Sequence, residues 1–130
     1  MRLVHESDGG TAVLASDVEI ADGFIQTSKG LMFQSSIPAD YALVFEFEPP
    51  SGISAMLPFS GDDAVARRFI HMLFVRMPLD VLWLQGQEVV HVKTLRPWVG
   101  TGMANADRIV ELPAGTASTV EVGDTVRLDT

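Results

Sequence analysis

The chain has 130 residues without cysteine, and seventeen acidic residues against nine basic ones give it a formal net charge of −8. This length fits one domain, residues 1–130, that buries its core without disulfides, and the lack of cysteine excludes cysteine-based zinc sites and a cysteine nucleophile. The negative charge argues against binding to nucleic acids or membrane surfaces, and a hydrophobic content of 47% argues against disorder.

The N-terminus and the apolar runs predict a cytoplasmic protein. Glu6 and Asp8 interrupt the first residues, where a secretory signal needs about 7–15 apolar residues. No stretch reaches the roughly 18 apolar residues of a membrane span. We therefore expect neither a targeting segment nor a membrane anchor.

The first third of the chain predicts a hairpin followed by a short helix. Residues 3–6 and 11–15 flank Asp8-Gly9-Gly10, which supplies turn chemistry. Ser16 or Asp17 then caps a helix that ends near Gly30. The apolar side of this helix consists of Ile20, Phe24 and Ile25.

The rest of the chain predicts further strands and a second short helix. Alternation of apolar and polar residues over 41–48 indicates a strand that is stopped by Pro49-Pro50. The remaining predicted strands cover residues 69–76, 79–84, 88–95, 108–112 and 125–128. Residues 50–68 and 97–105 are expected as connections, and 113–120 as one or two helical turns. Short strands with two minor helices predict an α+β fold, mainly antiparallel, in which the sheet forms a small barrel or sandwich.

The hairpin formed by residues 79–84 and 88–95 places Asp80 beside a titratable side chain. If Gly86-Gln87 forms the turn, Asp80 lies opposite Lys93, and if Gln85-Gly86 forms it, Asp80 lies opposite His91. Either arrangement gives a cross-strand ion pair, which we favour, or a carboxylate poised for acid–base chemistry or ligand binding.

Other candidate residues are basic, aromatic or imidazole side chains. Arg67-Arg68 and the nearby Arg76 form the only basic concentration, which is either a solvated loop end or an anchor for an anionic ligand. Trp98, in a loop rich in glycine and proline, is placed to line a pocket. The three histidines show no local spacing of metal ligands, so we expect neither a metal nor a cofactor.

The basic residues also bear on the source of the protein. Arg outnumbers Lys by seven to two, and acids are in excess, which is the balance expected where salt screens acidic repulsion. This favours a salt-adapted, haloarchaeal-like protein, and codon bias in a high-GC genome is the alternative.

Three stretches together resemble one family. Lys29-Gly30-Leu31-Met32 follows the first predicted helix, and Met77-Pro78-Leu79-Asp80-Val81-Leu82-Trp83 contains a Pro-Leu-Asp motif. The third is Glu111-Leu112-Pro113-Ala114-Gly115 followed by Val122-Gly123-Asp124-Thr125-Val126. Their order and spacing over about residues 12–128 are similar to the family called domain of unknown function 192.

This resemblance implies a compact β-rich α+β fold and no established activity. The family commonly carries Trp-Met-Lys-Asn-Thr before its Pro-Leu-Asp, whereas the aligned residues here are His71-Met72-Leu73-Phe74-Val75. A ligand site that used those polar groups would therefore be lost or remade in this chain. Asp80 of the Pro-Leu-Asp motif is retained in this chain, and His71 is a polar residue that the common family sequence does not have at this position.

Three hypotheses of function remain open. The first is noncatalytic binding of a small ligand or a protein partner near His71, Arg76, Asp80 and Trp98, with His91 as a further candidate. The second is a small hydrolase or isomerase that uses His71 or His91 with Asp80, which would require a contact of about 2.6–3.2 Å between carboxylate and imidazole. The third is a structural role in a homo-oligomer.

Overall fold

Ten β-strands make up the described part of the chain, which comprises residues 1–22, 37–46, 66–72 and 75–129 of a computed structural model. The strands are β1 (Arg2–Ser7), β2 (Gly10–Ala15), β3 (Asp17–Asp22), β4 (Tyr41–Glu46), β5 (Ala66–His71), β6 (Leu79–Gln85), β7 (Glu88–Leu95), β8 (Thr101–Ala106), β9 (Arg108–Pro113) and β10 (Thr125–Asp129). The described residues include no α-helix.

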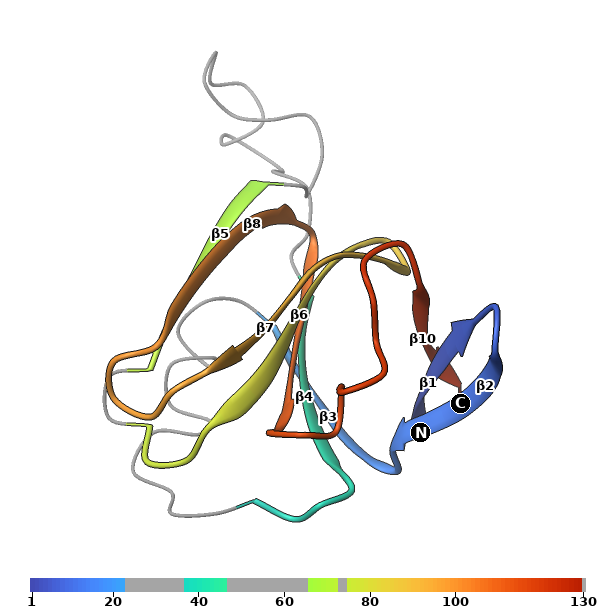
Figure 1. The fold of residues 1–130 in the computed structure, drawn as a ribbon, viewed down its shortest axis with the longest axis horizontal. Helices are drawn as coiled ribbons and strands as arrows, with labels where there is room; N and C mark the ends of the chain where they lie inside the picture. The colour runs from blue at the N-terminus through green and yellow to red at the C-terminus, as the bar shows by residue number, and fades with distance from the viewer. Residues whose placement is uncertain (23–36, 47–65, 73–74, 130) are drawn as a thin grey trace.

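Eight of these strands form the main sheet, in the order β2-β1-β10-β7-β6-β9-β4-β3. All pairs are antiparallel except β3 and β4, which run parallel. The remaining strands β5 and β8 pair with each other and form a two-stranded ribbon, which we call the ribbon (Figure 1). The main sheet ends at β2 and β3, so the predicted mainly antiparallel sheet is confirmed but it is not a closed barrel.

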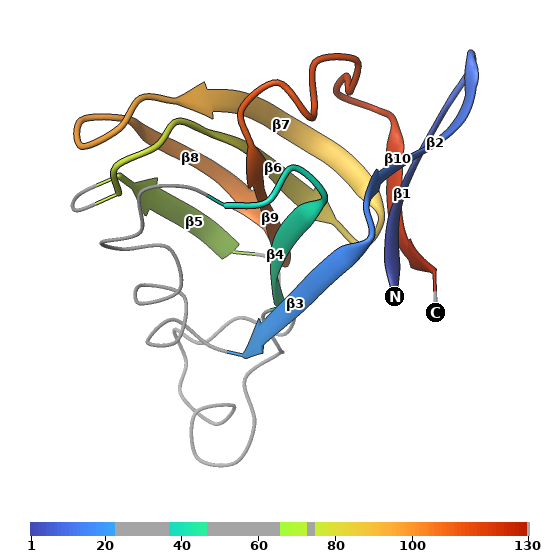
Figure 2. The ribbon, with the colours of Figure 1, turned by 90° about the horizontal axis from the view of Figure 1, so that it is seen from below.

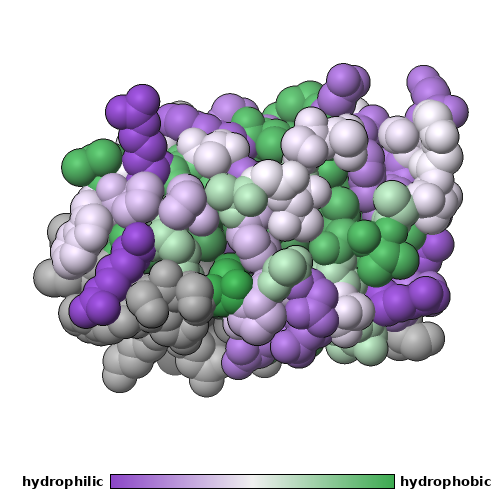
Figure 3. Space-filling view, turned by 60° about the horizontal axis from the view of Figure 1, so that its bottom comes forward, coloured by the Kyte–Doolittle hydropathy of each residue, from purple (hydrophilic) through white to green (hydrophobic). Residues whose placement is uncertain are grey.

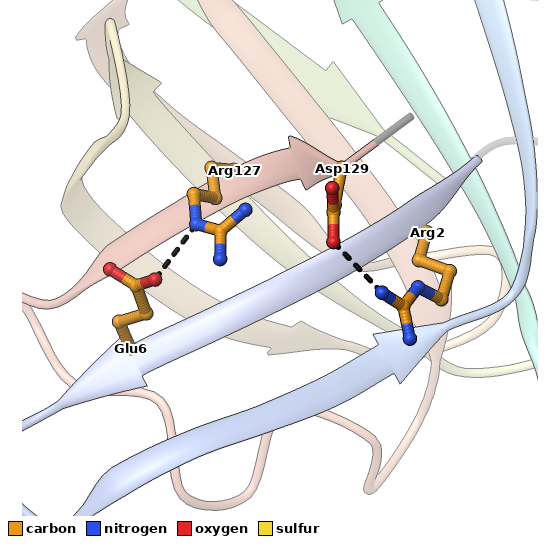
Figure 4. A network of polar contacts seen from close by, with 4 residues as sticks. All are labelled: Arg2, Glu6, Arg127 and Asp129. Atoms are coloured by element: carbon orange, nitrogen blue, oxygen red, sulfur yellow. Dashed lines mark hydrogen bonds and ion pairs between the residues drawn. The ribbon is translucent and has the colours of Figure 1, made fainter.

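The ribbon and the strands β1, β2 and β10 lie at opposite ends of the molecule (Figures 1 and 2). At the second end, two ion pairs link β1 to β10 (Figure 4). Arg2 Nη2 is 2.8 Å from Asp129 Oδ2, and Arg127 Nε is 2.8 Å from Glu6 Oε1. The cations of this end are therefore matched by neighbouring acids.

Strand β6 is buried on both faces because it lies inside the main sheet and apolar groups cover each side. Leu79, Val81 and Trp83 belong to the apolar cluster on one face, and Leu82 and Leu84 to the cluster on the other. We call the first the ribbon-side face, because it is the face that the ribbon covers. Nearly continuous apolar sequence is what such a central strand requires.

The ribbon packs directly on Trp83. The indole Nε1 of Trp83 donates a hydrogen bond of 3.0 Å to the carbonyl of Arg68 in β5. A Cβ atom on Gly102 in β8 would lie only 2.5 Å from Cη2 of Trp83, so the ring occupies the space of a side chain. The expectation that residues 97–105 form a loop was wrong for 101–105, which belong to β8, because a glycine that weakens a strand signal is needed here for close packing.

The first predicted helix does not begin at Ser16 or Asp17. Residues Asp17–Asp22 form β3 and pair in register with Tyr41–Glu46, because alternating Val18 and Ile20 fit a sheet edge beside β4. The rest of that prediction, including Phe24 and Ile25, lies outside the described residues. Residues 113–120 form successive turns whose N–H groups bond carbonyls three residues earlier, as in Thr116 to Pro113 at 3.1 Å.

The hairpin of β6 and β7 has a bulge that changes its register. Gly86 has φ +63°, as the first position of a type II′ turn requires, and Gln85 pairs with Glu88 around Gly86-Gln87. Beyond this turn, Leu84 pairs with Val89 but Trp83 pairs with His91, which leaves Val90 as the extra residue. Every later pair is therefore shifted by one, and Asp80 lies opposite Thr94 instead of Lys93 or His91.

Candidate functional site

Asp80 is buried, and its carboxylate bonds to two segments that are far apart in the sequence. It is 3% exposed, and its Oδ1 accepts a hydrogen bond of 2.6 Å from Thr94 Oγ1. Its Oδ2 accepts bonds of 2.9 Å from the backbone N–H groups of Gly115 and Ala117. The carboxylate thus links the β6–β7 hairpin to the turns that follow β9, through neutral donors and not through the cross-strand ion pair that we favoured.

His91 lies on the other face of the main sheet from Asp80. Its ring is 4.9 Å from that of Trp83, its partner across the strands, and both rings are on the ribbon-side face. Asp80 alternates with Leu79 and Val81 and therefore projects from the opposite face, beside Leu112. The sheet separates the two groups, so the Asp80–imidazole contact that a hydrolase or isomerase would need is not formed with His91.

His71, Arg76 and Trp98 are brought to one end of the molecule by hydrogen bonds between two loops. The N–H of Met72 donates to the carbonyl of Gly100 at 3.0 Å, and the N–H of Trp98 donates to that of Val75 at 3.1 Å. His71 ends β5, Arg76 follows Val75, and all three side chains are exposed. These backbone bonds bring the segments of His71, Arg76 and Trp98 together, whereas Asp80 lies buried between the β6–β7 hairpin and the turns after β9.

The outer face of the ribbon exposes apolar side chains. Phe69 pairs with Met103, and the two are 53% and 50% exposed, because Ile70 and Gly102 face inward instead. Trp98 and Val99, at 47% and 74%, extend this surface onto the neighbouring loop. We call Phe69, His71, Arg76, Trp98, Val99 and Met103 the ribbon surface. At this end of the molecule hydrophobic groups are exposed beside hydrophilic ones (Figure 3, left).

Charge is strongly segregated along the chain. Residues 66–79 and 89–106, which carry the ribbon, its two loops and most of β7, contain five cations and no acid. These cations are Arg67, Arg68, Arg76, Lys93 and Arg96. All other residues together have four cations against seventeen acids. Within the described residues no acid forms an ion pair with Arg76, Lys93 or Arg96, in contrast to the paired arginines of β1 and β10.

Glu111 is a buried acid that the sequence analysis did not select as a site residue. It is 8% exposed and lies in β9 between Leu43 of β4 and Val81 of β6. Burial raises the pKa of Glu111 from its ordinary 4.5 to about 8. The only signal in the sequence is a single acid among Ile109, Val110 and Leu112. This pattern is equally typical of an acid that faces solvent, so it did not indicate burial.

His5 forms a further buried polar contact. His5 is 4% exposed, and its Nε2 lies 2.7 Å from Oδ2 of Asp124. The same oxygen accepts a hydrogen bond of 3.0 Å from the N–H of Glu121. The hydrogen bond with His5 is the main cause that lowers the pKa of Asp124. This pair joins β1 to the turn before β10 and is part of the framework.

No group of three histidine or acidic side chains in the described ranges is arranged to hold a metal ion. None of the described residues belongs to a helix that is long and apolar enough to cross a membrane.

Comparisons with known proteins place the chain among uncharacterised relatives. The model of the family DUF192, described as an uncharacterized ACR, matches residues 4–128. A UPF0127 protein of Thermococcus gammatolerans is 31% identical over 131 residues, which cover 98% of this chain and 74% of that protein. A UPF0127 protein of Pyrococcus horikoshii is 34% identical over 115 residues, covering 85% and 86%. These relatives come from Thermococcus and Pyrococcus, so they do not support the haloarchaeal-like origin that the composition favoured.

Two solved structures share the fold. A candidate transcription regulator of Sinorhizobium meliloti 1021 has a TM-score of 0.76 and 20% identity, with 97% of this chain and 91% of that chain covered. A protein of unknown function from Novosphingobium aromaticivorans has a TM-score of 0.76 and 18% identity, with 98% and 84% covered. Identities this low establish the arrangement of strands alone.

Proposed function

Since the chain belongs to the DUF192 family of uncharacterised proteins, its activity has to be inferred from its own surface, and we propose that it is a noncatalytic domain that binds an acidic segment of a partner protein on the ribbon surface. The observation that carries this proposal is the exposure of large apolar side chains inside the part of the chain that has five cations and no acid.

The residue types of the ribbon surface are those of protein interfaces. Tryptophan, phenylalanine, methionine and arginine are enriched where partners meet, and aromatic and arginine side chains dominate the energy of binding. Phe69, Met103 and Trp98 are each about half exposed, so they can lose further surface to a partner without unfolding the ribbon. Arg76 adds a planar group that can hold a carboxylate through two hydrogen bonds.

The charge distribution selects an acidic partner. The exposed cations Arg76, Lys93 and Arg96 attract acidic segments, and the acidic remainder of the molecule repels their approach elsewhere. The same acidic remainder disfavours nucleic acids, whose phosphates extend well beyond one patch. An acidic segment with apolar side chains would match both features of the surface.

A noncatalytic role agrees with the state of Asp80. Both of its oxygens are occupied by three donors from the protein, so the carboxylate is a structural group. These contacts give no support to the hydrolase or isomerase hypothesis, in which Asp80 would orient the imidazole of His71 or His91.

The test uses a fluorescein-labelled peptide of sequence Glu-Phe-Glu-Glu-Leu-Glu-Glu-Phe and fluorescence anisotropy. We expect the double variant Arg76→Glu/Arg96→Glu to bind at least about tenfold more weakly than the natural protein. We expect Phe69→Ser to weaken binding as well, although it changes no charge.

The matched control is Arg2→Glu/Arg127→Glu, which makes the same change of net charge at the opposite end, where both arginines are exposed or half-buried in surface ion pairs. Equal weakening by both double variants would show that net charge alone governs binding and would contradict the proposal. Tighter binding of a twelve-residue oligothymidylate than of the peptide would contradict it too.

A further inference from the structure

The two edge strands of the main sheet differ in how they are protected against pairing with another chain. An edge strand presents unpaired N–H and C=O groups, and proteins block it with charged side chains, with proline or with a covering segment. At one edge, β3 carries Asp17, Glu19 and Asp22. At the other edge, β2 has the sequence Gly-Thr-Ala-Val-Leu-Ala, which contains neither a charge nor a proline. The edge at β2 therefore lacks the protection that β3 has.

The edge of β2 is exposed over most of its length. Residues 10–13 are exposed, Val13 to 51% of its surface. They pair regularly with β1 from Ser7 to Val4, and the register shifts only between Val13 and Ala15. In both ribbon views β2 lies at the rim of the molecule, at the opposite end from the ribbon (Figures 1 and 2). Every second residue of an antiparallel strand directs its N–H and C=O away from its partner, so β2 offers backbone groups to a further strand.

The ribbon strand β8 shows how an uncharged strand is covered in the same molecule. Its sequence also lacks charge and proline. The carbonyl of Thr101 accepts a hydrogen bond of 2.7 Å from Nζ of Lys93, and the carbonyl of Asn105 accepts one of 3.1 Å from Nε2 of Gln85. Side chains of the main sheet therefore occupy backbone groups of β8. Among the described residues, no side chain bonds to the backbone of β2 in this way.

We propose that β2 is a dimerisation edge, at which it pairs antiparallel with β2 of a second copy of this chain about a twofold axis. Pairing of identical strands in opposite directions is self-complementary, and here it sets only uncharged residues against each other. The same pairing at β3 would bring Asp17, Glu19 and Asp22 close to the same acids of the other copy, which destabilises a sheet. Assembly ends at two copies, because the main-sheet edges that remain are the two acidic β3 strands.

Salt strengthens this pairing because the two copies carry the same charge. Each copy has a net charge of −8, so the copies repel each other as they approach. Salt screens this repulsion, whereas the hydrogen bonds between the strands join uncharged groups. We expect the dissociation constant of the dimer to fall at least about tenfold from about 0.1 M to about 1 M KCl. Binding of an acidic segment at the ribbon surface weakens over the same range, so the two events are independent and distinguishable.

The experiment measures molar mass by sedimentation equilibrium in dilute and molar KCl, over a range of protein concentrations. We expect the natural protein to form a dimer that is more stable in molar KCl. Val13→Lys should abolish the dimer, because the facing β2 has no acid to pair with the new charge. The matched control is Ile20→Lys, which makes the same change at an exposed apolar side chain on β3 and should keep the dimer. Both variants have less net negative charge, so net charge alone predicts stronger association for both.

A cysteine on β2 tests where the two copies meet. The natural chain has no cysteine, so the thiol of Val13→Cys is its only one. We expect a short bismaleimide to link two copies of Val13→Cys and to leave Ile20→Cys unlinked. A natural protein that stays monomeric in molar KCl would leave the edge to a strand of another protein and would overturn the proposal. An undiminished dimer in Val13→Lys, an equal loss in Ile20→Lys, or equal cross-linking of the two cysteine variants would overturn it too.

Discussion

The buried carboxyl of Glu111 makes the stability of this protein fall as the pH rises from acid to mildly alkaline. In the unfolded chain the group titrates near its ordinary pKa of 4.5, whereas in the folded protein burial raises the pKa to about 8. Between these values the unfolded chain has lost the proton and the folded protein has kept it. The unfolded state therefore binds fewer protons, and the free energy of unfolding decreases with increasing pH.

The size of this effect follows from the interval between the two values. The interval from 4.5 to about 8 corresponds to about 5 kcal/mol at 1.36 kcal/mol per pKa unit. That is comparable with the whole free energy of unfolding of a small domain, which is roughly 5–15 kcal/mol. The loss should be complete above about pH 8, where both states are ionised.

The assay is urea unfolding at pH 5 and pH 9, followed by the fluorescence of the fully buried Trp83. We expect Glu111→Gln to be much more stable than the natural protein at pH 9 and close to it at pH 5. Glu46→Gln removes the same charge from a half-buried ion pair and should keep the steep pH dependence. If Glu111→Gln loses stability toward pH 9 as steeply as the natural protein does, the carboxyl does not titrate as its burial requires and the reasoning fails.

Three further predictions concern the framework and the charge. Asp80→Asn should lower the free energy of unfolding by roughly 2–3 kcal/mol, because an NH2 group replaces one of the two oxygens that accept bonds from Thr94 and two backbone N–H groups, so at least one of these donors loses its acceptor; urea unfolding at pH 7 with no change would contradict this. Gly102→Ala should cost about 1–3 kcal/mol in the same assay, because its Cβ would lie 2.5 Å from Trp83, whereas Gly9→Ala, with 3.8 Å to its nearest neighbour, should cost less. The melting temperature should rise from dilute to molar KCl because salt screens the net charge of −8, and a flat or falling curve would refute the salt-adaptation hypothesis.

Most strands could be predicted because their cause is local. The residues typical of strands in 79–84 and 88–95 and the turn at Gly86 predicted the β6–β7 hairpin to within one residue. The first helix was mispredicted at its start because Ile20 has helical spacing to Phe24 and strand spacing to Val18, and only the pairing of β3 with β4 selects the strand. The strand β8 was missed because Gly102 reads as a breaker until Trp83 is known to lie beneath it.

The arrangement of the candidate site could likewise be predicted from the sequence only in part. The sequence singled out Asp80, His71, Arg76 and Trp98 as unusual side chains, and three of them do lie at one end of the molecule. The bulge at Val90 and the two faces of the sheet then separated Asp80 from the histidine opposite which it was placed. A bulge arises from packing across strands, so neither turn considered for the hairpin could give its register.

By itself, the sequence determined what depends on neighbours along the chain: the strands and turns, the resemblance to DUF192, and the concentration of basic residues in an acidic protein. Only the tertiary structure decided which face each strand presents and what lies across from it. Asp80 and Glu111 are both acids within apolar strands, yet Asp80 accepts three hydrogen bonds, whereas no donor among the described residues bonds to Glu111. That difference depends on strands and turns far apart in the sequence, because the partners of a buried charge are set by packing and not by its local pattern.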